Sequence, residues 1–137
     1  MEKYTDETLV SLAAHTRENA YCPYSGIAVG AALLTEDGAL FLGANAENAA
    51  FGPSLCAERA AFAAALSAGH RKFSRIAVVG AKKNEAPRSF FPPCGICLQV
   101  MAEFCDENFE ILLFDGKKIA IKTLSSLLPH GFGAEHF

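Results

Sequence analysis

Apolar and polar residues follow one another along the chain in blocks that predict helices and strands. Apolar side chains recur at helical spacing after Thr5, whose hydroxyl and following acidic residues suit the start of a helix. Residues 27–35 form an apolar run typical of a buried strand. Asp37 and Gly38 form a turn to a second strand at residues 39–44. The first third of the chain therefore predicts a helix followed by a β-hairpin.

The rest of the chain continues this pattern with helices and strands in turn. We expect an alanine-rich helix at residues 56–68, a strand covered on both faces at 75–81, a helix at 94–104, strands at 109–114 and 118–121, and a short helix at 124–128. The last two strands meet at Asp115-Gly116, and so short a connection forces them antiparallel. The order predicts one α/β domain over residues 1–137, a three-layer α/β/α sandwich with a mixed five-stranded sheet.

Composition and charge exclude several classes of function. The 137 residues are 51% hydrophobic and 20% charged, which suffices for one core and excludes a disordered tail or a repeat array. The net charge is -3, and Lys and Arg occur in pairs instead of a stripe, so tight nucleic-acid binding is not expected. No stretch reaches the roughly 18 apolar residues of a membrane helix, and Met1 to Tyr4 lead into an acidic helix, not a signal peptide. We therefore expect a cytoplasmic protein that binds neither nucleic acid nor membrane.

The cysteines carry the clearest chemical signal. Five is an odd number, and without a secretory signal it favours metal-binding or catalytic thiols over disulfides. Cys94 and Cys97 lie three residues apart at a predicted helix start, on one face, and Cys56 opens the other packed helix. Three protein ligands leave a position for water on a metal, which is typical of catalytic sites. Glu58 follows two residues after Cys56 and is placed to move protons at that position.

Several motifs occur in a fixed order along the chain. They are YCPYS at 21–25, VGAAL at 29–33, NAEN at 45–48, CAER at 56–59, PCGIC at 93–97, and LLP at 127–129 followed by FG at 132–133. With these motifs, from Tyr21 to about Gly133, the chain resembles cytidine deaminases of the small, all-cysteine, homotetrameric type. The CAE and PC-x-x-C elements match the signature of zinc-dependent deaminases.

The resemblance assigns the reacting groups. It implies that Cys56, Cys94 and Cys97 bind one Zn²⁺ per subunit. It also implies that Glu58 takes a proton from the zinc-bound water and delivers it to N3 of cytosine, and that ammonia leaves after a second transfer. The expected reaction is the hydrolytic deamination of cytidine and 2'-deoxycytidine to uridine and 2'-deoxyuridine, as in pyrimidine salvage.

The resemblance also assigns substrate contacts. Asn45 and Glu47 match positions that hold the ribose 3'-hydroxyl, and a donor-acceptor amide beside a carboxylate suits that task. The backbone of Ala57 is expected against the base edge. Phe132 matches a residue that reaches a neighbouring subunit's site and stacks on the base. The chain is therefore expected to form a homotetramer with shared active sites.

Charge balance at the expected metal distinguishes this chain from the family that it resembles. Three thiolates on Zn²⁺ leave a net negative centre, and a cation hydrogen-bonded to the sulfurs offsets that charge. Arg59 is the candidate cation. Leu98 stands where the family commonly has a second arginine, followed by the expected Gln99, which we also assign to the surroundings of the metal. Our hypothesis is that Arg59 and the two helix ends suffice.

Two further departures concern the substrate. The family usually has an aromatic residue at the position of Ile27 and often a tyrosine at that of Phe51. One stacking surface and one hydroxyl are thus absent, which predicts a looser pocket around the pyrimidine or the 5'-hydroxyl. These differences leave an alternative function, the deamination of a modified cytosine nucleoside such as blasticidin S.

Other interpretations use the same residues differently. Cys94 and Cys97 alone fit a redox pair, or half of a structural zinc site completed by Cys22 or Cys105. The chain also fits a catalytically silent, zinc-stabilised scaffold that binds nucleosides, although a structural metal has no use for the proton shuttle of Glu58. A polynucleotide deaminase is disfavoured by the acidic charge and the antiparallel final hairpin.

Overall fold

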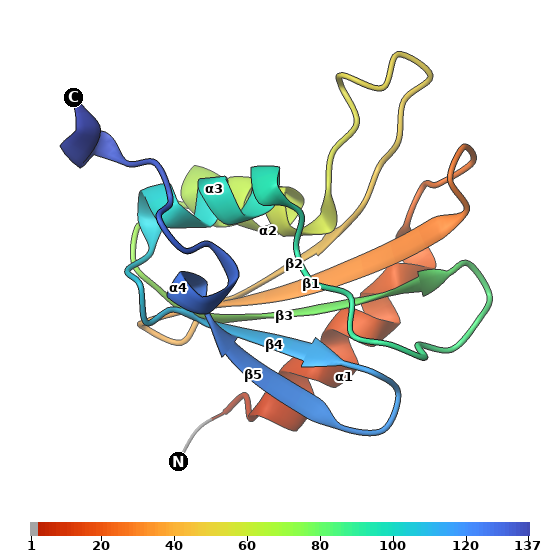
Figure 1. Cartoon of the computed structure of the whole chain (residues 1–137). Coiled ribbons are helices and arrows are strands. Elements are labelled where there is room, and N and C mark those ends of the chain that lie inside the picture. Colours follow the sequence, from red (N-terminus) through yellow and green to blue (C-terminus); the bar gives the residue numbers. More distant parts are fainter. Residues whose placement is uncertain (1–2) are drawn as a thin grey trace.

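The computed structural model describes residues 3–137 and has one five-stranded sheet at its centre (Figure 1). The strands are β1 (Ile27–Thr35), β2 (Leu40–Ala44), β3 (Phe73–Lys82), β4 (Glu110–Phe114) and β5 (Ile119–Thr123). Their order across the sheet is β2-β1-β3-β4-β5, and only the β3–β4 pair is parallel. The predicted mixed five-stranded sheet is confirmed. The expectation drawn from Met1 and Glu2 lies outside the described residues.

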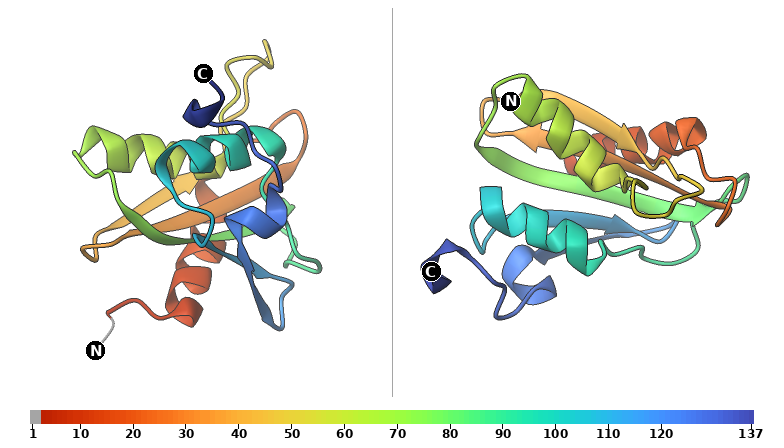
Figure 2. Two further views of the ribbon diagram at one scale, coloured as in Figure 1. Left: turned by 60° about the vertical axis from the view of Figure 1, so that its left-hand side comes forward. Right: turned by 90° about the horizontal axis from the view of Figure 1, so that it is seen from above.

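Helices cover both faces of the sheet. The helix α1 (Asp6–Thr16) lies on one face, and α2 (Ala57–Ser67) and α3 (Gly95–Phe104) lie side by side on the other (Figures 1 and 2). Three single-turn helices complete the described chain: η1 (Arg17–Asn19), α4 (Leu124–Leu127) and η2 (Ala134–His136). The predicted three-layer α/β/α sandwich is therefore confirmed. No helix among residues 3–137 is long and apolar enough to cross a membrane.

The two core layers follow from the alternation of side chains along the central strand. Ile76 and Val78 of β3 face the layer under α2 and α3, whereas Ala77 and Val79 face the layer under α1. All four are fully buried. A strand that is apolar on both faces is what a covered sheet requires, as the continuous run in the sequence predicted.

Two glycines allow the helices to approach the sheet closely. A Cβ placed on Gly30 of β1 would lie 1.9 Å from the carbonyl oxygen of Ala13 in α1. A Cβ on Gly43 of β2 would lie 2.3 Å from the carbonyl oxygen of Ala57, the first residue of α2. Side chains at these positions are excluded by backbone atoms. The close contact at Gly43 fixes the height of the α2 N-terminus above the sheet.

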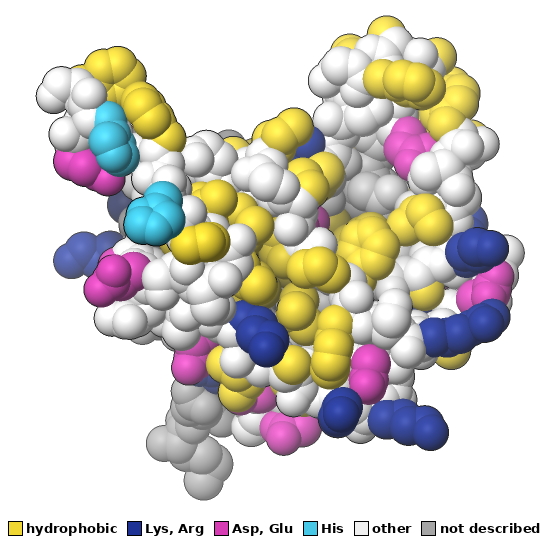
Figure 3. All heavy atoms as spheres, viewed as in Figure 1, with side chains coloured by type: hydrophobic (Ala, Val, Ile, Leu, Met, Phe, Trp, Pro, Cys, Tyr) yellow, Lys and Arg dark blue, Asp and Glu magenta, His cyan; other side chains and the backbone are white. Residues whose placement is uncertain are grey.

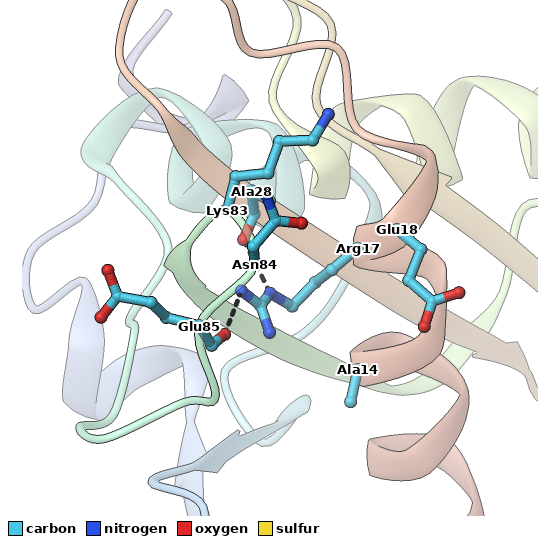
Figure 4. A pocket seen from close by; sticks show the side chains of 7 residues that line it. All are labelled: Ala14, Arg17, Glu18, Ala28, Lys83, Asn84 and Glu85. Atoms are coloured by element: carbon cyan, nitrogen blue, oxygen red, sulfur yellow. Dashed lines mark hydrogen bonds between the residues drawn. The ribbon is translucent and has the colours of Figure 1, made fainter.

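A nearly buried arginine ties the end of α1 to the sheet. Arg17 donates from Nε to the carbonyl oxygen of Ala28 over 2.9 Å, and from Nη2 to those of Lys82 and Glu85 over 3.2 and 3.1 Å. Figure 4 shows the guanidinium between these segments, beside a hollow of about 310 Å³. Its hydrogen bonds join the end of α1 to β1 and to the end of β3 and the loop that follows, so this residue has a structural role.

Candidate active site

The starts of α2 and α3 bring three cysteines together at one end of the sheet. Cys56 and Cys94 are the residues that cap the two helices, and Cys97 lies in the first turn of α3. The three sulfurs all lie within 4.8 Å of one another, and those of Cys94 and Cys97 are 3.7 Å apart. Sulfurs about 2.3 Å from a tetrahedral zinc ion are about 3.8 Å apart. The cluster therefore fits a zinc ion held by three thiolates.

The electrostatic environment of the cluster favours thiolate. The pKa of Cys56 is lowered to about 5, because the Cys97 thiol donates a hydrogen bond to it and because the Arg59 guanidinium lies beside it. The pKa of Cys97 is raised, because its proton is held in that bond and because it is buried. The N-termini of both helices add positive potential. A metal ion that binds here displaces the remaining protons.

Glu58 is the buried acid beside this cluster. It lies in the first turn of α2, and only 3% of the residue is exposed. Burial raises the pKa of its carboxyl to about 7, and the negative charge of Cys56 adds to this effect. A carboxyl that titrates near neutral pH can both take up and release a proton under working conditions, which is what general acid-base catalysis requires.

A hollow of about 590 Å³ leads from the cysteines to the ends of β1 and β2. It brings together nine of the residues predicted from the sequence: Ile27, Asn45, Glu47, Phe51, Cys56, Ala57, Glu58, Arg59 and Cys94. Cys97 lies behind them with its sulfur in the cluster, and Gln99 and Phe132 do not line this hollow. Its volume is in the range of small-molecule sites.

The end of the hollow away from the three cysteines carries two polar side chains that backbone hydrogen bonds hold in place. Asn45 accepts a hydrogen bond at Oδ1 from the amide of Val29 over 2.8 Å and donates from Nδ2 to the carbonyl of Ile27 over 2.9 Å. Glu47 accepts at Oε1 from the amides of Tyr24 and Ser25, each over 3.0 Å. Each side chain keeps unused hydrogen-bonding capacity. The pair is therefore positioned for a ligand hydroxyl.

The Ser25 hydroxyl holds the second oxygen of that carboxylate. Its Oγ donates to Oε2 of Glu47 and accepts from the amide of Ile27 over 2.9 Å. These bonds lower the pKa of Glu47, so the group stays ionised at neutral pH. The sequence had offered Ser25 only as part of a motif, and the structure gives it a definite contact.

Comparison with known proteins decides the family. The model of the family described as the cytidine and deoxycytidylate deaminase zinc-binding region matches residues 3–113. The chain belongs to this deaminase family. The predicted family is thus confirmed, and so is zinc as the metal, since the family is zinc-binding and the chain supplies the thiol cluster.

Relatives of this deaminase resemble it over nearly its whole length. A cytidine deaminase from Halalkalibacterium halodurans is 45% identical over 130 residues, which cover 94% of this chain and 95% of the relative. One from Sporosarcina psychrophila is also 45% identical over 130 residues, covering 94% and 92%. The crystal structure of cytidine deaminase from Burkholderia pseudomallei has a TM-score of 0.83 at 43% identity, covering 93% of this chain and 99% of the other. That of Mycobacterium tuberculosis has a TM-score of 0.77 at 34% identity, covering 93% and 96%.

Arg59 of the deaminase contacts the sulfur cluster directly. Its Nη2 donates to Sγ of Cys56 over 3.3 Å, and this bond raises the pKa of the guanidinium. Leu98, at the position of the family's second arginine, is buried in the core beneath α3. The cation that the structure shows at the cluster is thus Arg59, and Leu98 contributes packing instead of charge.

The structure brings Gln99 and Phe132 into contact with each other, outside the lining of the hollow. Gln99 donates from Nε2 to the carbonyl oxygen of Phe132. The Phe132 ring is 56% exposed and stacks on His136 with ring centres 5.0 Å apart. Gln99 thus holds the C-terminal segment to α3, and the Phe132 ring is left open on the surface.

Several residues that line the hollow had no site role assigned from the sequence, and Phe91, shortly before the cysteine motif, is the largest of them. Phe51, which was anticipated, is 74% exposed at the rim and lies edge-on to Tyr24, with ring centres 6.4 Å apart. The aromatic residues that line the hollow are therefore Phe51 and Phe91.

Proposed function

We propose that this chain catalyses the zinc-dependent hydrolytic deamination of cytidine and 2'-deoxycytidine to uridine and 2'-deoxyuridine. One observation carries the proposal: a buried acid, Glu58, lies beside a three-cysteine cluster at one end of a hollow whose other end holds Asn45 and Glu47. The reaction takes up water at C4 of the base and releases the amino group as ammonia. The names of the relatives, which are cytidine deaminases, support the same substrate class.

The donor set suits the metal that this chemistry needs. Cys56, Cys94 and Cys97 would hold zinc through three thiolates, which leaves one position open to a small ligand. When bound, zinc lowers the pKa of water to near neutrality and so supplies the attacking nucleophile.

Glu58 handles the protons of the reaction. Its carboxyl, with a pKa near 7, donates a proton to N3 of cytosine and so makes C4 more electrophilic. As water adds at C4, the resulting carboxylate takes a proton from that water and passes it to the departing amino group, which leaves as ammonia. The buried position keeps bulk water from the carboxyl and holds it close to the cluster.

Asn45 and Glu47 orient the nucleoside through its sugar. In our proposal they bind the 3'-hydroxyl, which cytidine and 2'-deoxycytidine share, so both sugars are accepted. The backbone of Ala57, at the start of α2, lies along the base edge. These contacts place C4 at the metal end of the hollow.

The active form in this proposal is a homotetramer in the cytoplasm that serves pyrimidine salvage. Two segments project from the body, one around Phe51 and the other from Phe132 to Phe137, and both present apolar side chains (Figure 3). Phe137 is 99% exposed. Large exposed aromatic side chains favour subunit contact. Light scattering should give the mass of four chains, and Phe132→Ala should raise the KM for cytidine. A monomer with full activity would contradict the shared site.

The other functions considered are not favoured. A silent zinc scaffold has no use for an acid whose burial raises its pKa to about 7. The relatives named above are cytidine deaminases, which does not favour a deaminase of a modified cytosine nucleoside.

The direct test is product analysis. Zinc-loaded protein incubated with cytidine should yield uridine and ammonia in equal amounts by chromatography and a coupled ammonia assay. Release of ammonia only from a modified cytosine nucleoside, or no deamination at all, would contradict the proposal.

A further inference from the structure

The Phe91 ring packs against β3 at Gly80, a position that has no side chain. A Cβ on Gly80 of β3 would lie 2.5 Å from Cγ of Phe91 and 2.6 Å from Cδ1. Gly80 pairs with Val29 of β1, which itself lines the hollow. Because Cγ is the fixed end of a phenyl ring, the ring can occupy this place only while position 80 is glycine.

Phe91 and Ile27 separate two spaces. Both residues line the active-site hollow of about 590 Å³, and both line a second hollow of about 310 Å³ that extends along β3 to Gly80. The Phe91 ring thus forms part of the partition between them. Removing it would join the two spaces.

The proposed reaction fixes which edge of the base meets this partition. N3 and C5 lie on opposite edges of the pyrimidine, on either side of C4. Glu58, on α2, serves N3, so the C5 edge faces away from α2. The segment that leads into α3 lines the same hollow as Glu58, and it carries Phe91 three residues before Cys94.

We propose that Phe91, seated on Gly80, is the residue that contacts the C5 edge of the base and sets the size of the substituent accepted there. The inference rests on the proposed cytidine deamination. An apolar ring at this edge provides contact area in a site where Ile27 offers only a small aliphatic surface. Gly80 is a positioning residue that acts through Phe91.

The test compares cytidine with 5-iodocytidine for wild type and for Phe91→Ala and Phe91→Leu. We expect Phe91→Ala to raise the KM for cytidine about fivefold with a smaller effect on kcat. The ratio of kcat/KM for 5-iodocytidine to that for cytidine should rise about tenfold, because the second hollow becomes accessible. Phe91→Leu should give an intermediate ratio. Phe90→Ala is the matched control, since Phe90 packs on the core and does not line the hollow.

A second set of variants tests the role of Gly80. Gly80→Ala should lower kcat/KM for cytidine in the wild-type background and have little further effect in the Phe91→Ala background, because the clash is then absent. Wild-type activity with an unchanged substrate ratio in both Phe91 variants would overturn this inference and leave the proposed function intact. Absence of cytidine deamination by the wild type would overturn both.

Discussion

Arg59 donates a hydrogen bond from Nη2 to Sγ of Cys56, with 3.3 Å between the two atoms. This bond couples the only cation that the described chain places on the sulfur cluster to the thiol whose pKa is lowered to about 5. The position of the family's second arginine is occupied by buried Leu98. The charge of the site therefore depends on one side chain.

We expect Arg59→Ala to weaken zinc binding about tenfold, because groups that hydrogen-bond to metal ligands contribute affinity of this order. The pKa of the Cys56 thiol in the metal-free protein should rise. Competition with a chromophoric chelator measures the first effect, and the pH dependence of thiolate absorbance measures the second. Arg71→Ala is the control, since Arg71 donates to the carbonyl oxygens of Leu66, in the last turn of α2, and of His70, just after that helix. Unchanged zinc affinity in the Arg59 variant would contradict this account.

The burial of Glu58 should make the metal-free protein less stable as the pH rises. Its pKa is raised from 4.5 to about 7, so the folded state binds more protons than the unfolded chain between these values. The unfolding free energy should therefore fall across that window and lose about 3 kcal/mol above pH 7. Glu58→Gln should remove this loss.

Urea unfolding of the zinc-free wild type and variant at pH 4.5 and pH 8 measures the difference. Glu103→Gln, an exposed change on α3, should behave as the wild type does. An equal dependence on pH in the wild type and the Glu58 variant would show that the buried carboxyl is not the source.

Ser25 should contribute to sugar recognition through Glu47. Ser25→Ala removes the hydroxyl that holds Oε2, so the carboxylate becomes less fixed. We expect the KM for cytidine to rise about fivefold with a small change in kcat, the result for a contact that acts on binding. With 3'-deoxycytidine, which lacks the hydroxyl in question, the variant and the wild type should differ little. An equal rise in KM for both substrates would contradict the claim that Ser25 acts on the 3'-hydroxyl through Glu47.

The contact between α1 and β1 gives a prediction on stability. Gly30→Ala places a methyl group against the carbonyl oxygen of Ala13, where it would lie at 1.9 Å. We expect the unfolding free energy to fall by about 2 kcal/mol as α1 is displaced. Gly52→Ala is the matched control, because a Cβ there meets its nearest neighbour at an ordinary 3.5 Å. Denaturant unfolding that gives equal values for both variants would contradict the role of Gly30.

Local signals in the sequence predicted most of the elements. The strand at residues 27–35 and the turn at Gly38 are observed where expected, since a continuous apolar run and a left-handed glycine are strong signals. The end of β5 was predicted too early. Its ladder with β4 continues to the pair of Glu110 and Thr123, and this register depends on the partner strand instead of on local composition.

The site could be predicted only as far as motifs extend. The spacing of Cys56 and Glu58 indicates a metal ligand with an acid beside it, because two residues at the start of one helix have a local geometry that the sequence determines. The contact of Phe91 with Gly80 joins residues from a loop and a strand, and no local pattern indicates it. The same holds for Gln99, whose side chain points to the C-terminal segment, because that direction depends on where the chain returns.

Glu58→Gln tests the central claim most directly. Zinc content and the fall in ultraviolet absorbance as cytidine becomes uridine should be measured together for wild type and variant. The account predicts a full complement of zinc in both proteins and a rate reduced about a thousandfold in the variant, because the amide cannot carry the proton. Turnover of cytidine by the variant at the wild-type rate would contradict the assignment of Glu58 as the proton carrier.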